Sequence, residues 1–528
     1  MLSPWQNREM TPGSLAQTLT EFLGGSRHAL VIEDGVQIFD LSEAHYSISG
    51  EHEKCLLHLW SAERNLVRRI VDLEVRYNSL RLRVQRLGQT RPSKLDICRD
   101  RDRRTPSARR TARAMYQARL RRVLERHFPD FTIGKLSNAM DLERSFGPIY
   151  ARGIIRRGRT AFAVLGVNEH EMQSSIDAAL TFGILWLDAC RRSQDARVLV
   201  EGLKLYLPAG TSALTRERMA HLHKGAAKWE LLELDERNDE VTSIDCADCG
   251  NLATRLVRCP DETAALERFE SSIHQVLSSL PECDVAVLSP AEIGFRWHGL
   301  EFARARVSHR DGTFTSGQEI VFGLGAEERL LEERSEVGWQ QLLQSLRQTR
   351  VPRGSQNQLL WRMHPERWLE SLVIHDVSAL DERLDPAAYY SQVPAFAASD
   401  RAMLDVLGIT REGRLAVLEL KADEDIHLPL QGLDYWTRVR WHHARREFQN
   451  FGYFQGRGLS EAEPMLFLVA PTLHIHPATD TLLRYLDPAI DWTLVGIDER
   501  WRDGVRSIFR KRSTTRNLVT EMAGVEAD

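Results

Sequence analysis

The sequence predicts an α/β protein of several domains, in which the C-terminal region, residues 351–510, forms an αβββαβ core. Three observations support this fold class. Apolar runs of strand length alternate with segments whose apolar residues recur at helical spacing. The run 415–420 is almost entirely apolar, which is typical of a central strand buried on both faces. The length of 528 residues corresponds to about two to four domains.

The elements of this core follow one another in order. A proline at a first helical position and apolar residues at helical spacing predict a helix over 365–377. Two strands, 402–409 and 415–420, are expected to form a hairpin through the loop 410–413. The other expected elements are a strand at 389–396, a helix at 430–448, a strand at 465–470, a helix at 478–486 and a strand at 492–497, followed by a further helix and strand.

The preceding residues predict mixed α/β and helical domains, divided as 1–130, 131–260 and 261–350, with a short tail at 511–528. The first is expected to begin with β structure at 28–41 and to be mostly helical over 56–127. The second should contain strands at 160–167 and 197–207 on either side of an apolar helix near 174–191. The third should contain a helix, short strands around 285–288 and 302–307, and a second helix before Arg350.

Charged side chains stand at the end of the central strand of the predicted hairpin. Glu419 and Lys421 are two residues apart, so they point to the same face of the strand. If the turn is centred near residue 412, Asp405 lies opposite Glu419. Two facing carboxylates repel each other unless a divalent cation lies between them, so the pattern predicts a metal site beside a lysine. The alternative is a structural ion pair, which also occurs in buried strands.

The order of elements, the Asp405…Glu419-x-Lys421 set and the Gln431-x-x-x-Tyr435 pattern resemble the PD-(D/E)XK nuclease superfamily. The glutamine and tyrosine resemble its RecB-like and Cas4-like branch, and the core resembles the restriction-endonuclease-like fold. The resemblance covers roughly residues 359–500. One departure is that no proline directly precedes Asp405.

The resemblance implies metal-assisted hydrolysis of a phosphodiester and assigns roles to individual residues. Asp405, Glu419 and the backbone carbonyl of Leu420 would bind Mg²⁺ or Mn²⁺, which prefer oxygen ligands. Lys421 would orient or activate the attacking water and offset negative charge. Glu370 would be an additional metal carboxylate, and Glu366, one helical turn away, competes for this role. Gln431 and Tyr435 would position the substrate or Lys421. Arg438 and His442 would contact phosphates.

Basic residues concentrate in one part of the chain. Residues 67–125 carry eighteen Lys and Arg against six Asp and Glu, although the net charge of the whole chain is −4. Such a stretch is the electrostatic footprint expected of nucleic-acid contact, here through Arg109, Arg110 and Arg113. The alternative is an arginine-rich helical pair that packs on acidic neighbours.

A second candidate for the same signature is rejected on spacing. Glu201 and Lys204 lie three residues apart in a predicted strand, so they point to opposite faces unless the strand contains a bulge. A degenerate, non-catalytic nuclease-like domain remains compatible with this region.

Seven cysteines in so long a chain argue against a disulfide framework, and no apolar run approaches the length of a membrane span. We therefore expect a cytoplasmic protein with no membrane partner.

The leading hypothesis is a magnesium- or manganese-dependent nuclease that acts on DNA, in repair or in defence against foreign DNA. The alternatives are a catalytically silent nuclease-fold protein that binds nucleic acid or serves as a scaffold, and a ribonuclease, because the sequence does not distinguish DNA from RNA. A homo-oligomer or a partner protein is compatible with either.

Overall fold

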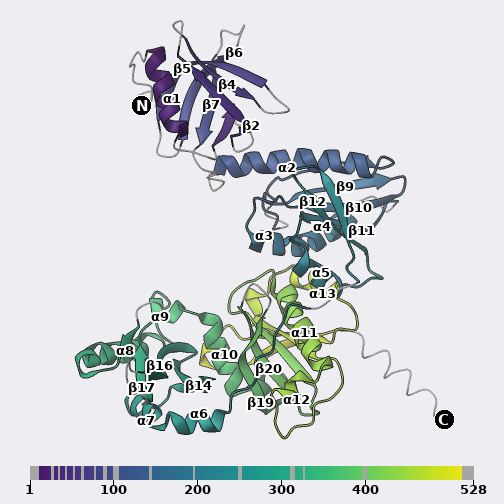
Figure 1. The fold of residues 1–528 in the computed structure, drawn as a ribbon. Helices are drawn as coiled ribbons and strands as arrows, with labels where there is room; N and C mark the ends of the chain where they lie inside the picture. Colours follow the sequence, from purple (N-terminus) through teal and green to yellow (C-terminus); the bar gives the residue numbers. More distant parts are fainter. Residues whose placement is uncertain are drawn as a thin grey trace, which may run out of the picture.

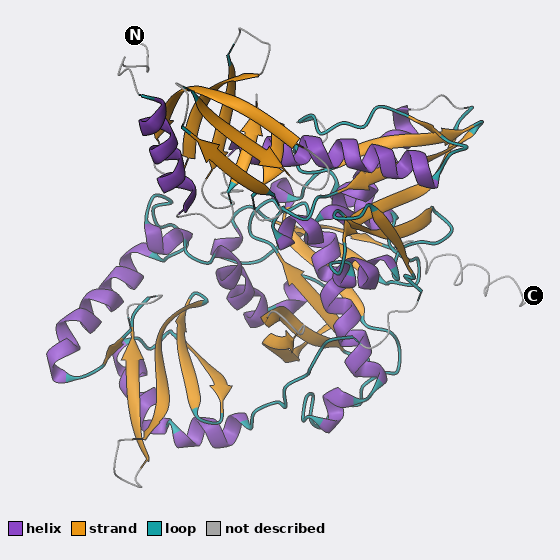
Figure 2. Ribbon diagram, turned by 45° about the horizontal axis from the view of Figure 1, so that its top comes forward, coloured by secondary structure: helices purple, strands orange, loops and turns teal. Residues whose placement is uncertain are grey.

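The structure is a computed structural model of mixed α/β architecture with four sheets in its described part (Figures 1 and 2). It describes residues 11–513 with gaps. The residues outside the description within this range are 25–28, 34–35, 42–43, 51–53, 61–64, 76–78, 87–91, 99–105, 142–144, 194–196, 248–251, 310–315, 325–327 and 397–400.

The first unit is an antiparallel sheet in the order β2-β1-β7-β6-β5-β4-β3, with one helix packed on it. Its elements are α1 (Pro12–Gly24), β1 (Leu30–Glu33), β2 (Val36–Asp40), β3 (His45–Ser49), β4 (Cys55–Trp60), β5 (Asn65–Val75), β6 (Ser79–Arg86) and β7 (Ser93–Cys98). The expected β structure at 28–41 is confirmed. The expected helical segment at 56–127 is wrong up to residue 98. Leu80, Leu82 and Val84 are buried in alternation with arginines, which is the period of a strand rather than of a helix.

The second unit, which we call the middle module, spans residues 106–244 and has a mixed sheet covered by helices on both faces. Its elements are α2 (Pro106–His127), β8 (Thr132–Ile133), β9 (Ala151–Arg157), β10 (Thr160–Gly166), α3 (Gln173–Asp177), α4 (Ala179–Ser193), β11 (Leu199–Pro208), α5 (Ala213–Met219), β12 (Lys228–Asp235) and β13 (Glu240–Ile244). The basic helix α2 packs on one face of this sheet through Tyr116 and Leu120, and α4 packs on the other.

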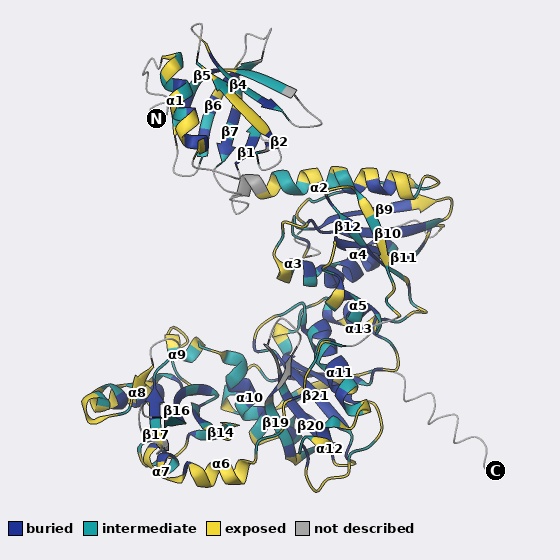
Figure 3. Cartoon of the chain, in the orientation of Figure 1, coloured by how far each residue is buried: buried dark blue, intermediate teal, exposed yellow. Residues whose placement is uncertain are grey.

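The third unit is an antiparallel sheet in the order β14-β15-β16-β17-β18, with helices before and after it. Its elements are α6 (Glu262–Arg268), α7 (Glu270–Ser279), β14 (Asp284–Ser289), β15 (Glu292–Trp297), β16 (Leu300–His309), β17 (Ser316–Phe322), β18 (Arg329–Leu330), η1 (Glu333–Ser335) and α8 (Glu336–Thr349). The expected strands and the two expected helices of this region are confirmed. In Figure 3 the outer faces of α6 and α8 are exposed, whereas the side chains of the helices that contact the sheet belong to its core.

The fourth unit, the C-terminal module, contains the helix and strands predicted for the core. Its elements are α9 (Leu359–Arg362), α10 (Pro365–His375), η2 (Val377–Ala379), β19 (Leu384–Phe396), β20 (Arg401–Thr410), β21 (Leu415–Leu420), α11 (Leu428–Ala444), α12 (Glu447–Asn450), β22 (Met465–Pro471), η3 (Thr472–His474), α13 (Thr479–Arg484), β23 (Trp492–Ile497), η4 (Trp501–Asp503) and β24 (Ser507–Arg512). The strand order is β19-β20-β21-β22-β23-β24, with β21, β22 and β23 parallel to one another and the other neighbours antiparallel.

The sheet of the C-terminal module is buried on both faces, which explains the nearly continuous apolar composition of β21 (Figure 3). One face packs on α10, and the other packs on α11 and α13. The core on the second face is not confined to this module. It continues into the middle module through α4 and α5, so a single hydrophobic cluster joins the two.

Candidate active site

The hairpin of β20 and β21 forms with the register that the sequence predicts. Val406 pairs with Leu418 and Leu407 pairs with Val417, so one further step along the ladder places Asp405 opposite Glu419. The turn is closed by the Gly413 amide, which donates to the Thr410 carbonyl at 2.8 Å. Gly413 has a φ of +80°, a left-handed conformation that glycine adopts at little cost. The turn therefore sets the two carboxyl groups face to face.

Both carboxyl groups are withdrawn from solvent. Glu419 is 2% exposed, and burial together with the neighbouring Asp405 raises its pKa well above the usual range. Burial also raises the pKa of Asp405, although the Leu420 amide donates to its Oδ2 at 3.0 Å and acts in the opposite direction. The pair therefore holds a proton at a pH at which an exposed carboxyl group would have lost it, and a cation placed between the two would displace that proton.

Lys421 lies beside the pair, as the alternation of the strand predicts. Its Nζ is 3.0 Å from Glu419 Oε1 and 3.5 Å from Glu366 Oε1. Burial alone would lower the pKa of Lys421, but the two carboxylates outweigh burial and raise it above the ordinary value. Lys421 is therefore a charged ammonium group at neutral pH, held at the end of a rigid buried strand.

Helix α10 brings two more carboxylates to the same end of the sheet. Glu366, in the first turn of the helix, is the one that contacts Lys421. Glu370 is buried and pairs with Arg367 at 2.7 Å. Nearby Asp405 contributes to the raised pKa of both, after burial as the main cause. Glu366 thus makes the direct contact, whereas Glu370 has its charge offset by Arg367.

Gln431 and Tyr435 approach the pair from α11, on the other face of the sheet. Burial, and then Glu419 and Asp405, raise the pKa of the Tyr435 hydroxyl, so it remains a proton donor at neutral pH. The helix can come this close because Gly432 lies against the sheet. A Cβ added there would meet Leu468 at 2.4 Å and would lie 3.7 Å from the Cβ of Glu419. Asp405, Glu419, Lys421 and Tyr435 of the predicted set are therefore brought together at one strand end, and Gln431 directly precedes Gly432 on the helix that packs there.

The donor atoms suit a hard divalent cation. Two buried oxygens of the site, Glu419 Oε2 and Gln431 Oε1, have no hydrogen-bond partner among the described residues. Buried polar atoms without partners are costly, and such atoms at a site indicate a ligand. No three His, Cys, Asp or Glu side chains in the described ranges are arranged to hold a metal ion. A cation would therefore depend on Asp405 and Glu419 together with oxygen atoms of other kinds, including the Leu420 carbonyl.

Arg438 and His442 continue the polar stripe of α11, but the structure places them in internal contacts. Arg438 is buried and donates to the Asp434 carbonyl at 2.8 Å. His442 is also buried, with Nδ1 against Glu447 and Nε2 2.9 Å from Thr254 Oγ1.

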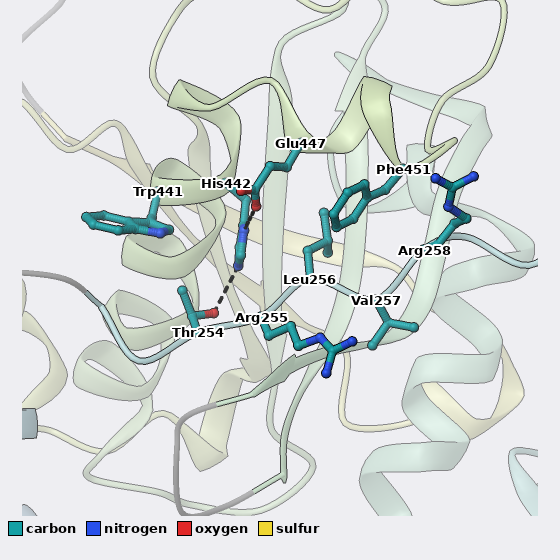
Figure 4. Close-up of a pocket in the computed structure, with 9 residues that line it drawn as sticks. All are labelled: Thr254, Arg255, Leu256, Val257, Arg258, Trp441, His442, Glu447 and Phe451. Carbon is teal, nitrogen blue, oxygen red and sulfur yellow. Dashed lines mark hydrogen bonds and ion pairs between the residues drawn. The ribbon is translucent and has the colours of Figure 1, made fainter.

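Figure 4 shows the His442 ring between its two partners in a pocket formed by α11, α12 and the segment 254–258. Both ring nitrogens are therefore engaged within the chain, so His442 is placed to hold the segment 254–258 against α11.

The arginines of α2 lie on the middle module, whereas the carboxyl pair belongs to the sheet of the C-terminal module (Figure 1). Arg109 and Arg110 are exposed. Arg113 is largely covered and pairs with Glu171 at 2.7 Å. Arg119, one and a half turns further along, pairs with Glu236 and Asp239. Part of the basic stretch is therefore structural. Its exposed arginines lie at both ends of α2, with Arg109 and Arg110 at the N-terminal end and Arg121 and Arg122 near the C-terminal end.

Contacts also settle the expectation for Glu201 and Lys204. Lys204 pairs with Glu230 and Glu201 pairs with Lys228, so Glu201 and Lys204 serve different ion pairs. Sequence reasoning missed Arg218, whose guanidinium donates to both carboxylate oxygens of Asp434 on α11, at 2.8 and 2.7 Å. These partners are 216 residues apart, and no local pattern in the sequence indicates the pairing.

The chain matches no family model and no curated protein. Within the described residues, no helix combines the length and the apolar character needed to cross a membrane.

Proposed function

We propose that the C-terminal module is a restriction-endonuclease-like domain and that the protein is a metal-dependent nuclease acting on DNA. The observation that carries the proposal is the juxtaposition of Asp405, Glu419 and Lys421 at the end of β21. The αβββαβ order of the module and the approach of Gln431 and Tyr435 from α11 support it. The raised pKa of buried carboxyl groups is typical of functional sites, because a purely structural core has no need of them.

In the proposed mechanism, Asp405, Glu419 and the Leu420 carbonyl would hold a Mg²⁺ or Mn²⁺ ion. When bound, the ion supplies Lewis-acid charge for activating water and for neutralising phosphate oxygens. The Lys421 ammonium group donates a hydrogen bond to the attacking water or to a phosphate oxygen and offsets the negative charge that develops there. The Tyr435 hydroxyl remains protonated and can donate a hydrogen bond from the α11 side. Gln431 positions the substrate.

The experiment is metal-dependent cleavage of labelled single-stranded, double-stranded and flapped DNA and of RNA. We expect the wild type to cut DNA with Mg²⁺ or Mn²⁺, and we expect Lys421→Met to lower the rate by about a hundredfold or more, because it removes a charge that acts in the transition state. Lys204→Met is the matched control, since Lys204 is also a buried strand lysine paired with a carboxylate, in the middle module. Full activity of Lys421→Met would refute the role of Lys421.

The same assay separates the two alternatives. A silent nucleic-acid-binding protein would bind these substrates without cutting them, in every metal tested. The completeness of the Asp405, Glu419 and Lys421 set argues against this, because a site that has lost its activity is free to lose its charged residues. Cleavage of RNA alone would make the protein a ribonuclease with the same site.

A further inference from the structure

The sheets of the middle and C-terminal modules have the same strand order and the same strand directions. In the middle module the order is β8-β9-β10-β11-β12-β13, with β10, β11 and β12 parallel and the outer neighbours antiparallel. The C-terminal sheet repeats this pattern from β19 to β24. Connections match as well, because α2, α4 and α5 take the places of α10, α11 and α13 in the chain order.

The ladders show which residues of the two modules correspond. The amide of Lys421, just after β21, donates to the Val469 carbonyl on β22, and the amide of Val167, just after β10, donates to the Tyr206 carbonyl on β11. Val167 therefore stands in the place of Lys421. Two residues earlier, Leu165 takes the place of Glu419.

The neighbouring strand and helix complete the correspondence. Leu165 pairs with Arg152, which takes the place of Asp405. On the helices, Gly183 of α4 approaches Leu203 on β11, as Gly432 of α11 approaches Leu466 and Leu468 on β22. Aligning the two glycines puts Phe182 in the place of Gln431 and Trp186 in the place of Tyr435.

Every chemistry-bearing position of the proposed active site is thus replaced in the middle module. The carboxylates become Arg152 and Leu165, and the lysine becomes Val167. Arg152 is buried, and its guanidinium lies 4.7 Å from the centre of the Phe146 ring and 5.8 Å from the centre of the Trp186 ring. These contacts place a cation–aromatic cluster where the C-terminal module has its two carboxyl groups.

The two modules pack together about an approximate twofold axis. Leu222, just after α5, and Leu486, just after α13, form an antiparallel bridge. It is flanked by two symmetric hydrogen bonds, from His223 to the Tyr485 carbonyl and from Asp487 to the His221 carbonyl, both 2.9 Å. Helix α5 packs on α11 and, reciprocally, α13 packs on α4. Figures 1 and 3 show α5 and α13 side by side at this junction. Reciprocal contacts of this kind define the isologous interface of a dimer.

The end of β21, which carries the proposed active site, and the corresponding end of β10, which we call the silent end, also lie near each other. Thr181 Oγ1, in the first turn of α4, is 3.1 Å from His427 Nδ1 at the N-terminus of α11. The ring of Phe182, in the place of Gln431, lies 5.8 Å from the His427 ring. The N-termini of the two corresponding helices therefore meet, and the two strand ends open toward the same region of the molecule.

We propose that the middle module is a silent second copy of the nuclease fold, that it replaces the second subunit of a dimer, and that the chain therefore cuts only one strand of double-stranded DNA in each binding event. This inference rests on the proposed function. The strands of a duplex are antiparallel and related by twofold axes, so two active sites related by a twofold axis can reach both strands. With one of the two sites replaced, the second strand faces Arg152, Leu165 and Val167.

The test combines a cleavage assay with a mass measurement on the full chain. Limiting wild-type protein is incubated with supercoiled plasmid and Mg²⁺ or Mn²⁺, with Lys421→Met as the negative control. We expect open-circular DNA to accumulate to most of the substrate before linear DNA appears, with an initial rate proportional to protein concentration. In sedimentation, we expect one chain of 60.4 kDa, both alone and on a short duplex.

Linear DNA formed directly from supercoiled DNA, or a cutting species that contains two chains, would overturn the inference. If the wild type cuts no substrate, the proposed function fails and the one-strand cleavage fails with it, and the mass then decides only whether the middle module replaces a second subunit. One chain on the duplex then supports the inference that the middle module replaces the second subunit, and two chains would overturn that inference.

Discussion

The ends of β10 and β21 occupy the same place in two similarly ordered sheets, yet one is apolar and the other is charged. Leu165 and Val167 end the first, and Glu419 and Lys421 end the second. The fold therefore accepts hydrophobic residues at these positions. Burying carboxyl groups in the second sheet costs free energy that packing alone does not require. The difference supports the proposal that the charges at β21 serve catalysis, because the neighbouring module forms the same sheet without them.

The largest effect on cleavage is expected when the leucine found at the end of β10 replaces its counterpart at the end of β21. Glu419→Leu should lower cleavage by about a hundredfold or more, since it removes a proposed metal ligand. It should also raise the thermal midpoint, because a buried carboxyl group with a raised pKa is removed. Cleavage rates and thermal unfolding without added metal measure the two effects. Glu412→Gln, in the exposed turn, is the control, and a lower midpoint for Glu419→Leu would contradict the comparison.

The second largest effect concerns the contact between the modules. Arg218→Met should lower the free energy of unfolding by about 3 kcal/mol, because it leaves the largely covered Asp434 without its partner. Urea unfolding measures this loss. Arg484→Met is the matched control in the same interface, since Arg484 is 66% exposed and lies 3.7 Å from Asp188. Because Arg484 is exposed, this pair should contribute about 0 to 1 kcal/mol. Equal losses in the two variants would show that the Arg218 pair does not stabilise the junction.

The third effect is on pH dependence. The pKa values of Asp405 and Glu419 are raised in the folded protein, so the folded state binds more protons than the unfolded state just above the ordinary carboxyl pKa. The free energy of unfolding without metal should therefore fall as pH rises from about 4.5 through the raised values, by at most about 1.4 kcal/mol per pH unit for one proton.

Urea unfolding at pH 5 and pH 8 measures this slope. Glu419→Gln should flatten it, and Mg²⁺ should restore stability at the higher pH, because the ion binds the deprotonated pair. An unchanged slope in Glu419→Gln would place the responsible groups elsewhere.

The smallest effect compares the helices that precede the two sheets. Helix α10 brings carboxylates to the active strand end, whereas α2 carries exposed Arg109 and Arg110. Reversing both arginines to glutamate should weaken DNA binding severalfold at low salt and reduce the salt slope by about one for each phosphate that is no longer neutralised. Titrations of a labelled duplex at several salt concentrations measure the slope. Lys228→Glu, on an exposed lysine of the middle module, is the control for charge reversal outside α2. An unchanged slope would make the basic stretch structural, as it already is at Arg113.

Sequence reasoning succeeded where the pattern is local and strong. The strands β21 and β23 have the predicted limits, and the register that places Asp405 opposite Glu419 follows from the position of the turn. It failed over β5 and β6, where the sequence predicts a basic helix. In β6, arginines instead alternate with the buried Leu80 and Leu82. The high density of arginines does not distinguish a helix from a strand, whereas the period of two in the apolar residues identifies this strand.

The αβββαβ order of the C-terminal module and the charged residues at the end of β21 follow from the sequence alone, because strand alternation and turn position are properties of neighbouring residues. Other relations become visible only in the folded chain. Glu366 contacts Lys421, and Arg218 pairs with Asp434. The middle module repeats the same sheet, with Arg152 and Leu165 in place of the carboxylates. These relations join residues that lie far apart in the chain. The packing of α5 on α11 and of α13 on α4 creates the pairing between the modules, and no periodicity within a single element contains that information.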